Sequence, residues 1–126
     1  MSFLTDYKRV AGLGSAKTGT EHFVEQRLSA IALIPLSLLF LYTFIPALGA
    51  GYEAVLAIYA RPIPALIAIM FIWAMFSHLR MGLQVVIEDY IPNHRVQMRL
   101  LIINALLWRA AAIAGVFAVA KLAFTA

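Results

Sequence analysis

One apolar run of this sequence carries side chains that can bind a metal, an anion or a hydrogen-bonding ligand. His78 and Arg80 lie inside the run, and Asp89 and Tyr90 lie near its end, just before Pro92. Ionisable side chains are costly inside an apolar segment, so each needs a partner or a function. A neutral imidazole in a dry helix bundle is a natural axial ligand for haem iron, and a phenol can donate a hydrogen bond to a ligand carbonyl.

Helical spacing predicts what surrounds His78. At about 100° per residue, Gly82 lies about 40° and Val85 about 20° around the helix from His78, so the glycine leaves room for a bulky planar group. Tyr90 follows after about 12 residues, or about 18 Å along a helix, which places it at the membrane surface. The alternatives are a buried histidine that is hydrogen-bonded to a neighbouring helix, and a tyrosine that only anchors the helix at the interface.

The arginines also have two interpretations. Arg27 and Arg80 could each extend along apolar surface until the guanidinium reaches water. Alternatively, they could hold anionic groups, such as porphyrin propionates, at that interface. Arg109 lies deeper in its apolar run and could pair with a group on a partner subunit.

The composition indicates a membrane protein. Of 126 residues, 63% are hydrophobic and 13% are charged, whereas a soluble domain has about 25% charged residues. The lack of cysteine excludes disulfides, iron–sulfur ligation by this chain and thiolate zinc sites. The net charge of +4 could attract nucleic acid. We expect no nucleic-acid binding, however, because several basic residues flank apolar runs, where they set membrane orientation.

Three apolar segments are long enough to cross a lipid bilayer, for which about 20 residues suffice. We therefore expect an all-α membrane protein with a cytoplasmic N-terminal arm over residues 1–26 and a three-helix transmembrane anchor over residues 27–126. Pro35 should kink the first helix, which a membrane tolerates when neighbouring groups satisfy the freed carbonyl. The predicted spans cover about residues 29–50, 64–88 and 97–124.

The basic residues predict the orientation of these spans. Cytoplasmic segments near spans carry an excess of lysine and arginine. The N-terminus and the loop after the second span should therefore be cytoplasmic, with the C-terminus on the other side. The basic residues expected on the cytoplasmic side are Lys8, Arg9, Lys17, Arg27, Arg95 and Arg99. Those expected on the opposite side are Arg61 and Lys121.

These motifs together resemble a known family. The segment Gly82–Tyr90, preceded by His78 and Arg80, closely resembles the signature of the hydrophobic membrane anchor subunit of succinate dehydrogenase, the D-type chain. The segments Gly14–Thr20 and Gln26–Ala32 resemble the start of the first helix in alphaproteobacterial and mitochondrial members. Length, three spans and orientation agree, so the resemblance covers nearly the whole chain.

The resemblance implies an anchor in the bacterial inner membrane, with a cytoplasmic N-terminus and a periplasmic C-terminus, that serves the respiratory chain and the tricarboxylic acid cycle. It would complete a helix bundle with a cytochrome b556-type anchor subunit, clasp one haem b between the two, and dock the iron–sulfur subunit and the flavoprotein subunit. By match to the family motif, His78 would be one axial ligand of the haem iron. Tyr90 would hydrogen-bond a ubiquinone carbonyl with support from Asp89, and Arg27 would be a haem-propionate or site-entry contact. Arg80 has the same implied role in some forms of the pattern.

The second haem ligand and the remaining quinone-site residues would come from other chains. On this reading the chain is not catalytic alone, and electrons from succinate reach quinone through the iron–sulfur subunit. Two other functions agree with the residues themselves. One is a purely structural three-helix membrane subunit without a cofactor, and the other is a small transporter component that uses His78 and Arg109 in a polar pathway.

Overall fold

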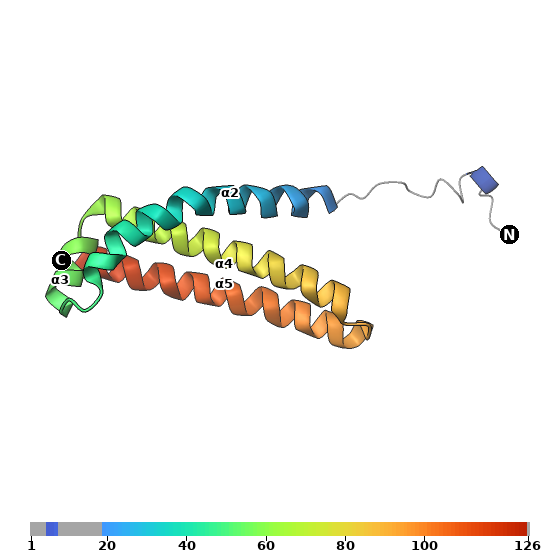
Figure 1. The fold of residues 1–126 in the computed structure, drawn as a ribbon. Helices are drawn as coiled ribbons and strands as arrows, with labels where there is room; N and C mark the ends of the chain where they lie inside the picture. The colour runs from blue at the N-terminus through green and yellow to red at the C-terminus, as the bar shows by residue number, and fades with distance from the viewer. Residues whose placement is uncertain (1–4, 8–18, 126) are drawn as a thin grey trace.

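A computed structural model describes residues 5–7 and 19–125, and within these ranges it contains helices and short connections but no β-strand. Most of the predicted N-terminal arm, including Lys8, Arg9 and Lys17, lies outside the described residues. The predicted all-α fold is confirmed. The elements in chain order are α2 (Gly19–Phe44), a 3-10 helix η1 (Ile45–Ala47), α3 (Tyr52–Tyr59), α4 (Pro62–Tyr90) and α5 (His94–Thr125) (Figure 1).

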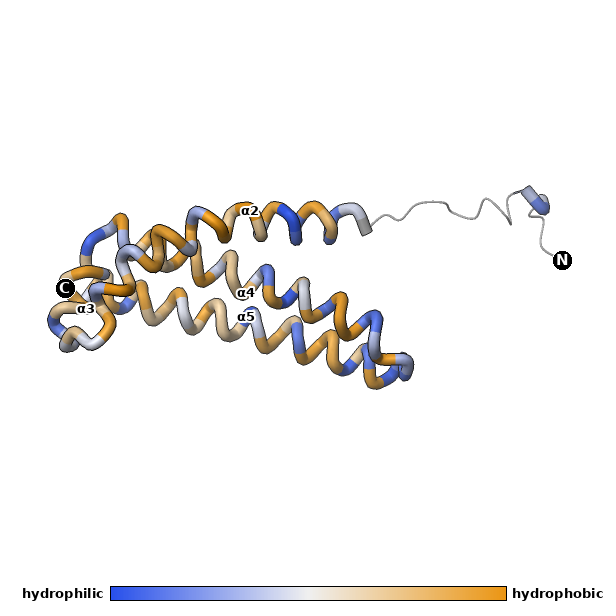
Figure 2. Tube along the Cα trace, in the orientation of Figure 1, coloured by the Kyte–Doolittle hydropathy of each residue, from blue (hydrophilic) through white to orange (hydrophobic). Residues whose placement is uncertain are grey.

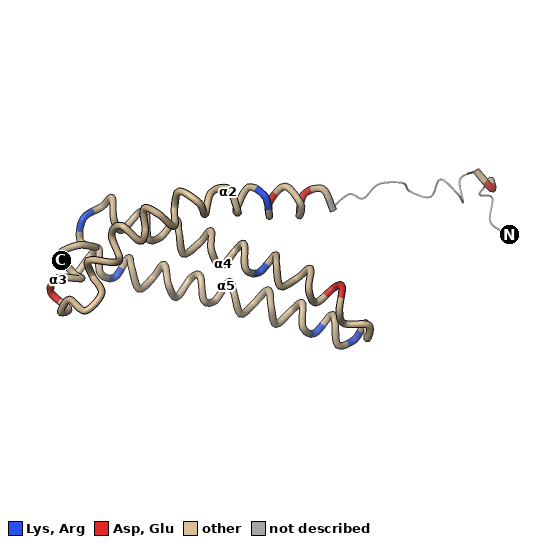
Figure 3. The backbone as a smooth tube through the Cα atoms, in the orientation of Figure 1, with Lys and Arg blue, Asp and Glu red and all other residues tan. Residues whose placement is uncertain are grey.

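Three helical segments are long and apolar enough to cross a membrane, as the sequence predicts. They cover Thr20–Ala47, Pro62–Tyr90 and His94–Thr125. Hydrophobic residues continue along all three helices, and most charged residues lie towards the ends and connections, although hydrophilic residues also occur partway along α4 and α5 (Figures 2 and 3). Large apolar side chains are exposed on every one of these helices, which agrees with contact to lipid or to other membrane helices.

The helix ends differ from the predicted spans for local reasons. Helix α2 already begins at Gly19 and ends at Phe44, whereas the first span was expected at residues 29–50. Pro46 lies near the start of η1, directly after the end of α2. Gly49 then adopts a positive φ of 75°, which glycine reaches without strain. The chain therefore leaves the helix before Ala50 and forms α3 before α4 begins.

The turn between α4 and α5 is closed by side chains. The Asn93 Oδ1 accepts hydrogen bonds from the backbone N–H groups of Arg95 (3.1 Å) and Val96 (3.3 Å), so Asn93 caps the start of α5. Across the turn, the Gln97 Nε2 donates to the backbone carbonyl of Glu88 at 3.1 Å. These bonds fix the end of α4, where Asp89 and Tyr90 lie.

Helix α4 is the central helix of the bundle, with α2 packed on one side and α5 on the other. On the α2 side, the rings of Phe40 and Phe71 stack with their centroids 4.5 Å apart. On the α5 side, Gly115 allows a close approach, because a Cβ atom there would lie only 2.9 Å from Cγ2 of Ile72. Asn104 of α5 is buried, and its Nδ2 donates to the Arg80 backbone carbonyl at 3.0 Å.

Candidate cofactor-binding groove between α2 and α4

His78 lies on the side of α4 that faces α2, and its ring is held by a serine. The Ser29 Oγ is 3.0 Å from the His78 Nδ1 and also donates to the Gln26 backbone carbonyl at 2.9 Å. A serine hydroxyl has one proton, so while Ser29 donates it to the Gln26 carbonyl, its oxygen can only accept from His78. In that arrangement Nδ1 is engaged with Ser29, and Nε2 is the ring nitrogen left for a metal.

The structure places Arg27 in the same cavity as His78. This cavity measures about 460 Å³ and is otherwise lined by side chains of α2, including Phe23 and Gln26. The Arg27 Cζ lies 4.8 Å from the centroid of the Phe23 ring, a cation–π contact that orients the guanidinium. An anionic group and a histidine-bound metal could therefore occupy one cavity, with Arg27 and His78 as their respective contacts.

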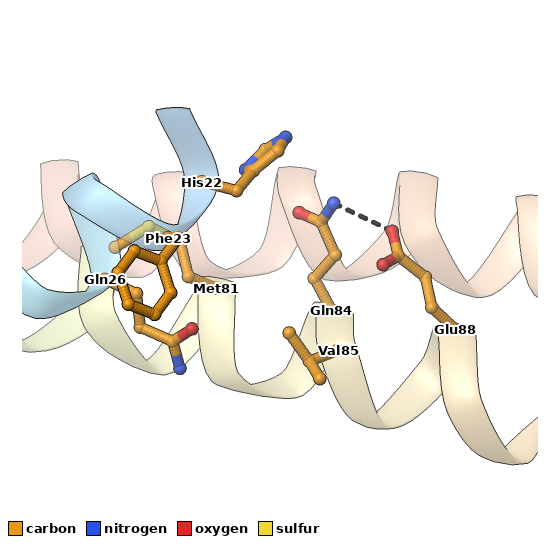
Figure 4. Close-up of a pocket in the computed structure, with 7 residues that line it drawn as sticks. All are labelled: His22, Phe23, Gln26, Met81, Gln84, Val85 and Glu88. Carbon is orange, nitrogen blue, oxygen red and sulfur yellow. Dashed lines mark hydrogen bonds between the residues drawn. The ribbon is translucent and has the colours of Figure 1, made fainter. Parts of the chain in front are cut away.

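A second cavity of about 440 Å³ adjoins the first, since Phe23 and Gln26 line both. Together they form a groove between the first half of α2 and the second half of α4. Figure 4 shows its polar contacts, in which the Gln84 Nε2 donates to the Glu88 Oε1 at 2.9 Å. The lining residues are His22, Phe23, Gln26, Met81, Gln84, Val85 and Glu88.

The sequence reasoning did not assign several of these groove residues, although their spacing carried a signal. Met81, Val85 and Glu88 follow His78 at helical intervals and so share its face of α4. The partners from α2 could not be chosen in this way, because nothing in the sequence sets how far α2 slides along α4. The space beside Gly82 is open, since a Cβ atom there would meet nothing within 4 Å, and its role beside a planar group stays a prediction.

Asp89 and Tyr90 lie beyond this groove, at the exposed end of α4. Tyr90 is 77% exposed. Neither side chain has a hydrogen-bond partner within residues 5–7 and 19–125, and neither lines the groove cavities. The structure therefore separates the Asp89–Tyr90 pair from His78 along one helix, as the spacing predicts, and leaves the phenol free for a ligand.

Arg80 lies on the other side of α4. It lines a cavity of about 320 Å³ between α4 and α5 together with Arg109, whereas His78 lines the groove between α2 and α4. The propionate role that the resemblance implies for Arg80 stays a prediction. Of the two arginines implied in that role, Arg27 is the one that shares a cavity with His78.

The donors in the groove suit a haem better than a bare metal ion. Within the described part of the chain, no three histidine, cysteine or acidic side chains gather closely enough to hold a metal ion. A haem instead needs a single imidazole nitrogen per protein ligand, a contact for its propionates and space for its ring. The Nε2 of His78, the Arg27 guanidinium and the open groove between α2 and α4 supply these features.

Comparison with known proteins agrees with the fold. The family model of succinate dehydrogenase/fumarate reductase transmembrane subunits matches residues 1–120. The succinate dehydrogenase hydrophobic membrane anchor subunit of Paracoccus denitrificans is 34% identical over 122 residues, covering 97% of this chain and 94% of that protein. The subunit of the same name from Rickettsia bellii is 34% identical over 103 residues, with 79% and 80% covered. No solved structure gives a significant match. The chain belongs to the succinate dehydrogenase/fumarate reductase transmembrane subunit family.

Proposed function

We propose that this chain is a membrane anchor subunit of a succinate:quinone oxidoreductase that supplies one axial ligand to a haem b. The observation that carries the proposal is the Ser29–His78 hydrogen bond, which engages Nδ1 and so leaves Nε2 as the free ring nitrogen beside a cavity that also contains Arg27. A bound haem would supply reversible one-electron chemistry at this position. Family membership and the hydrophobic membrane anchors among the relatives support the assignment to this enzyme.

Each residue of the groove has a distinct task in this proposal. Ser29 holds the His78 ring in one tautomer and one orientation, as outer hydrogen-bond partners of metal ligands do. Arg27 binds a carboxylate of the propionates through charge-assisted hydrogen bonds. Within the described residues, no second histidine lines the cavity of His78, so the other axial ligand comes from a cytochrome b556-type partner subunit.

The exposed end of α4 is the proposed quinone and docking site. The Tyr90 hydroxyl donates a hydrogen bond to a ubiquinone carbonyl, and Asp89 beside it supports the polar surroundings. The flavoprotein and iron–sulfur subunits dock over this end and complete the pocket. Arg95 and Arg99 follow the same turn, so the positive-inside rule assigns this end to the cytoplasmic side of the bacterial inner membrane.

Gentle purification of the tagged chain tests the proposed function. We expect it to bring the flavoprotein, iron–sulfur and second anchor subunits with it, together with succinate-dependent quinone reduction. The reduced complex should show a b-type absorption band at about one haem per complex, since His78 offers one axial position. The same partners without a band would support the structural subunit without a cofactor. Unrelated partners without a band would support the transporter alternative.

Replacing Tyr90 with phenylalanine should lower the rate of quinone reduction about 3- to 10-fold, the effect of losing one hydrogen bond of roughly 1 kcal/mol. Haem content and subunit composition should be unchanged, because Tyr90 lines neither groove cavity. The measurement is succinate–quinone reductase activity in purified complex. Tyr52→Phe is the matched control, since Tyr52 is also exposed but begins α3. Equal rates for Tyr90→Phe and wild type would leave Tyr90 as an interfacial anchor only.

A further inference from the structure

The cavity between α4 and α5 has no part in the proposed haem and quinone roles, apart from the implied propionate contact of Arg80. It lies on the side of α4 opposite the His78 groove and measures about 320 Å³. Arg80 and Ser77 of α4 line it together with Arg109 of α5, and Trp73 and Trp108 provide large aromatic walls. Two arginines in one cavity between membrane helices require an explanation.

The two guanidinium groups have no counter-charge from this chain. The sequence contains six acidic residues, and none of them lines the cavity. Within residues 5–7 and 19–125, neither Arg80 nor Arg109 forms an ion pair. Two positive charges that share a region of low dielectric constant repel one another strongly. The compensating anion must therefore come from outside the chain. The six acidic residues are Asp6, Glu21, Glu25, Glu53, Glu88 and Asp89.

The cavity walls also offer more hydrogen-bond donors than acceptors. Each guanidinium has several N–H groups and no acceptor. The Arg80 carbonyl, which could have served as an acceptor, already receives the Asn104 side chain. A ligand with several anionic oxygen atoms, such as a phosphodiester, matches this excess of donors.

The two arginines lie at neighbouring levels along the bundle. Between Arg61 and Arg80, α4 contains no charged residue over about 19 positions, or about 28 Å, close to the ~30 Å thickness of a hydrocarbon layer. Arg80 therefore lies beyond the long apolar run, in the half of α4 that leads to Asp89 and Tyr90. Side chains of a helix lean towards its N-terminus, and α4 and α5 run in opposite directions, so Arg80 and Arg109 lean along the bundle towards each other's level.

The surroundings of the cavity suit acyl chains. Trp73 is 57% exposed and Ile113 is 64% exposed, and both line the cavity beside the arginines. Basic pockets between membrane helices are known to bind anionic lipid headgroups. We propose that this cavity binds the headgroup of an anionic phospholipid, with Arg80 and Arg109 holding its phosphate. The proposal uses a different side of α4 from the haem ligand and does not depend on it.

Native mass spectrometry of the purified complex tests this site. The complex is stripped of lipid in a non-ionic detergent and titrated with phosphatidylglycerol or with phosphatidylcholine. The wild type should bind phosphatidylglycerol at least tenfold more tightly than phosphatidylcholine. The variant Arg80→Gln/Arg109→Gln should lose that preference, whereas Arg80→Lys/Arg109→Lys should keep part of it because the charges remain. Arg99→Gln is the matched control, since Arg99 is an exposed arginine of α5 outside the cavity. It should bind as the wild type does.

Three results would overturn the proposal. The first is an unchanged phosphatidylglycerol preference in Arg80→Gln/Arg109→Gln. The second is a double variant that keeps its lipid but loses a subunit, which would assign the counter-charge to a protein carboxylate. The third is displacement of phosphatidylglycerol by an equal concentration of inorganic phosphate. If the double variant does not assemble, the single variant Arg109→Gln replaces it, because Arg109 is exposed and its substitution should leave the fold intact. This single substitution should still weaken phosphatidylglycerol binding severalfold.

Discussion

Purified complex that carries His78→Ala is expected to lose the reduced b-type absorption band, with haem content below about 10% of wild type. The substitution removes the Nε2 ligand, and within the described residues no other histidine lines that cavity. The fold of the chain should persist, because Ser29 still donates to the Gln26 carbonyl when its contact with His78 is gone. The measurement is a pyridine haemochrome assay on complex whose subunit composition has been verified.

Two further variants show whether the effect is specific to the His78 ligand. His94→Ala should keep the full band, since His94 is exposed at the start of α5. Ser29→Ala should give an intermediate result: the ligand remains, but its ring loses the acceptor that holds Nδ1–H. Loss of such an outer partner weakens metal binding by about 10- to 100-fold, so this variant should release haem on dilution. A full band in His78→Ala would contradict the ligand assignment.

The largest effect on stability is expected from Gly115→Ala. The new Cβ atom would lie 2.9 Å from Cγ2 and 3.6 Å from Cδ1 of Ile72, so α5 must move away from α4. Ile72 is β-branched and has little rotamer freedom in a helix, so its side chain cannot easily move aside. Overpacking of this kind lowers the free energy of unfolding by about 1–3 kcal/mol. The measurement is the unfolding midpoint of the chain in detergent micelles.

Gly82→Ala is the matched control for this prediction. It introduces the same methyl group into a helix, but at a position where a Cβ atom meets nothing within 4 Å. Its effect on stability should be neutral or favourable by up to about 1 kcal/mol, because alanine has the higher helix propensity. In an Ile72→Ala background the same Gly115→Ala substitution should cost less, since Cγ2 and Cδ1 are then absent. Equal midpoints for Gly115→Ala and Gly82→Ala would disprove the close approach.

The three long helices could be predicted because hydropathy alone specifies them. Their ends could not be predicted to the same precision, since caps and turn conformations decide where a helix stops. Helix α2 ends at Phe44 because Pro46 and Gly49 redirect the chain, and α3 forms in a segment that hydropathy treats as a connection. At its other end, α2 already begins at Gly19. It therefore includes polar residues that lie before the span expected at residues 29–50.

The residue types of the candidate site could be predicted from the sequence, but the contacts between residues of α2 and residues of α4 could not. His78 stands out because it is ionisable in an apolar run, but its contact with Ser29 depends on the register between α2 and α4. That register results from side-chain packing between helices that are far apart in the sequence. The same limit affects Arg27 and Arg80, which the resemblance assigns to one role. At about 100° per residue, Arg80 lies about 160° from His78 around α4, and only the packing shows which neighbour each side meets.

The central position of α4 has a consequence for how this family can change in length. Ser29 reaches His78 from one side of α4, and Asn104 bonds the Arg80 carbonyl from the other. One residue inserted between Pro62 and His78 would rotate the rest of α4 by about 100° and shift it by about 1.5 Å relative to the start of the helix. The Ser29–His78 contact and the Asn104–Arg80 contact would then be lost together. A substitution, in contrast, alters one side at a time. Insertions and deletions should therefore be confined to the connections around α3, where no long helix has to stay in register.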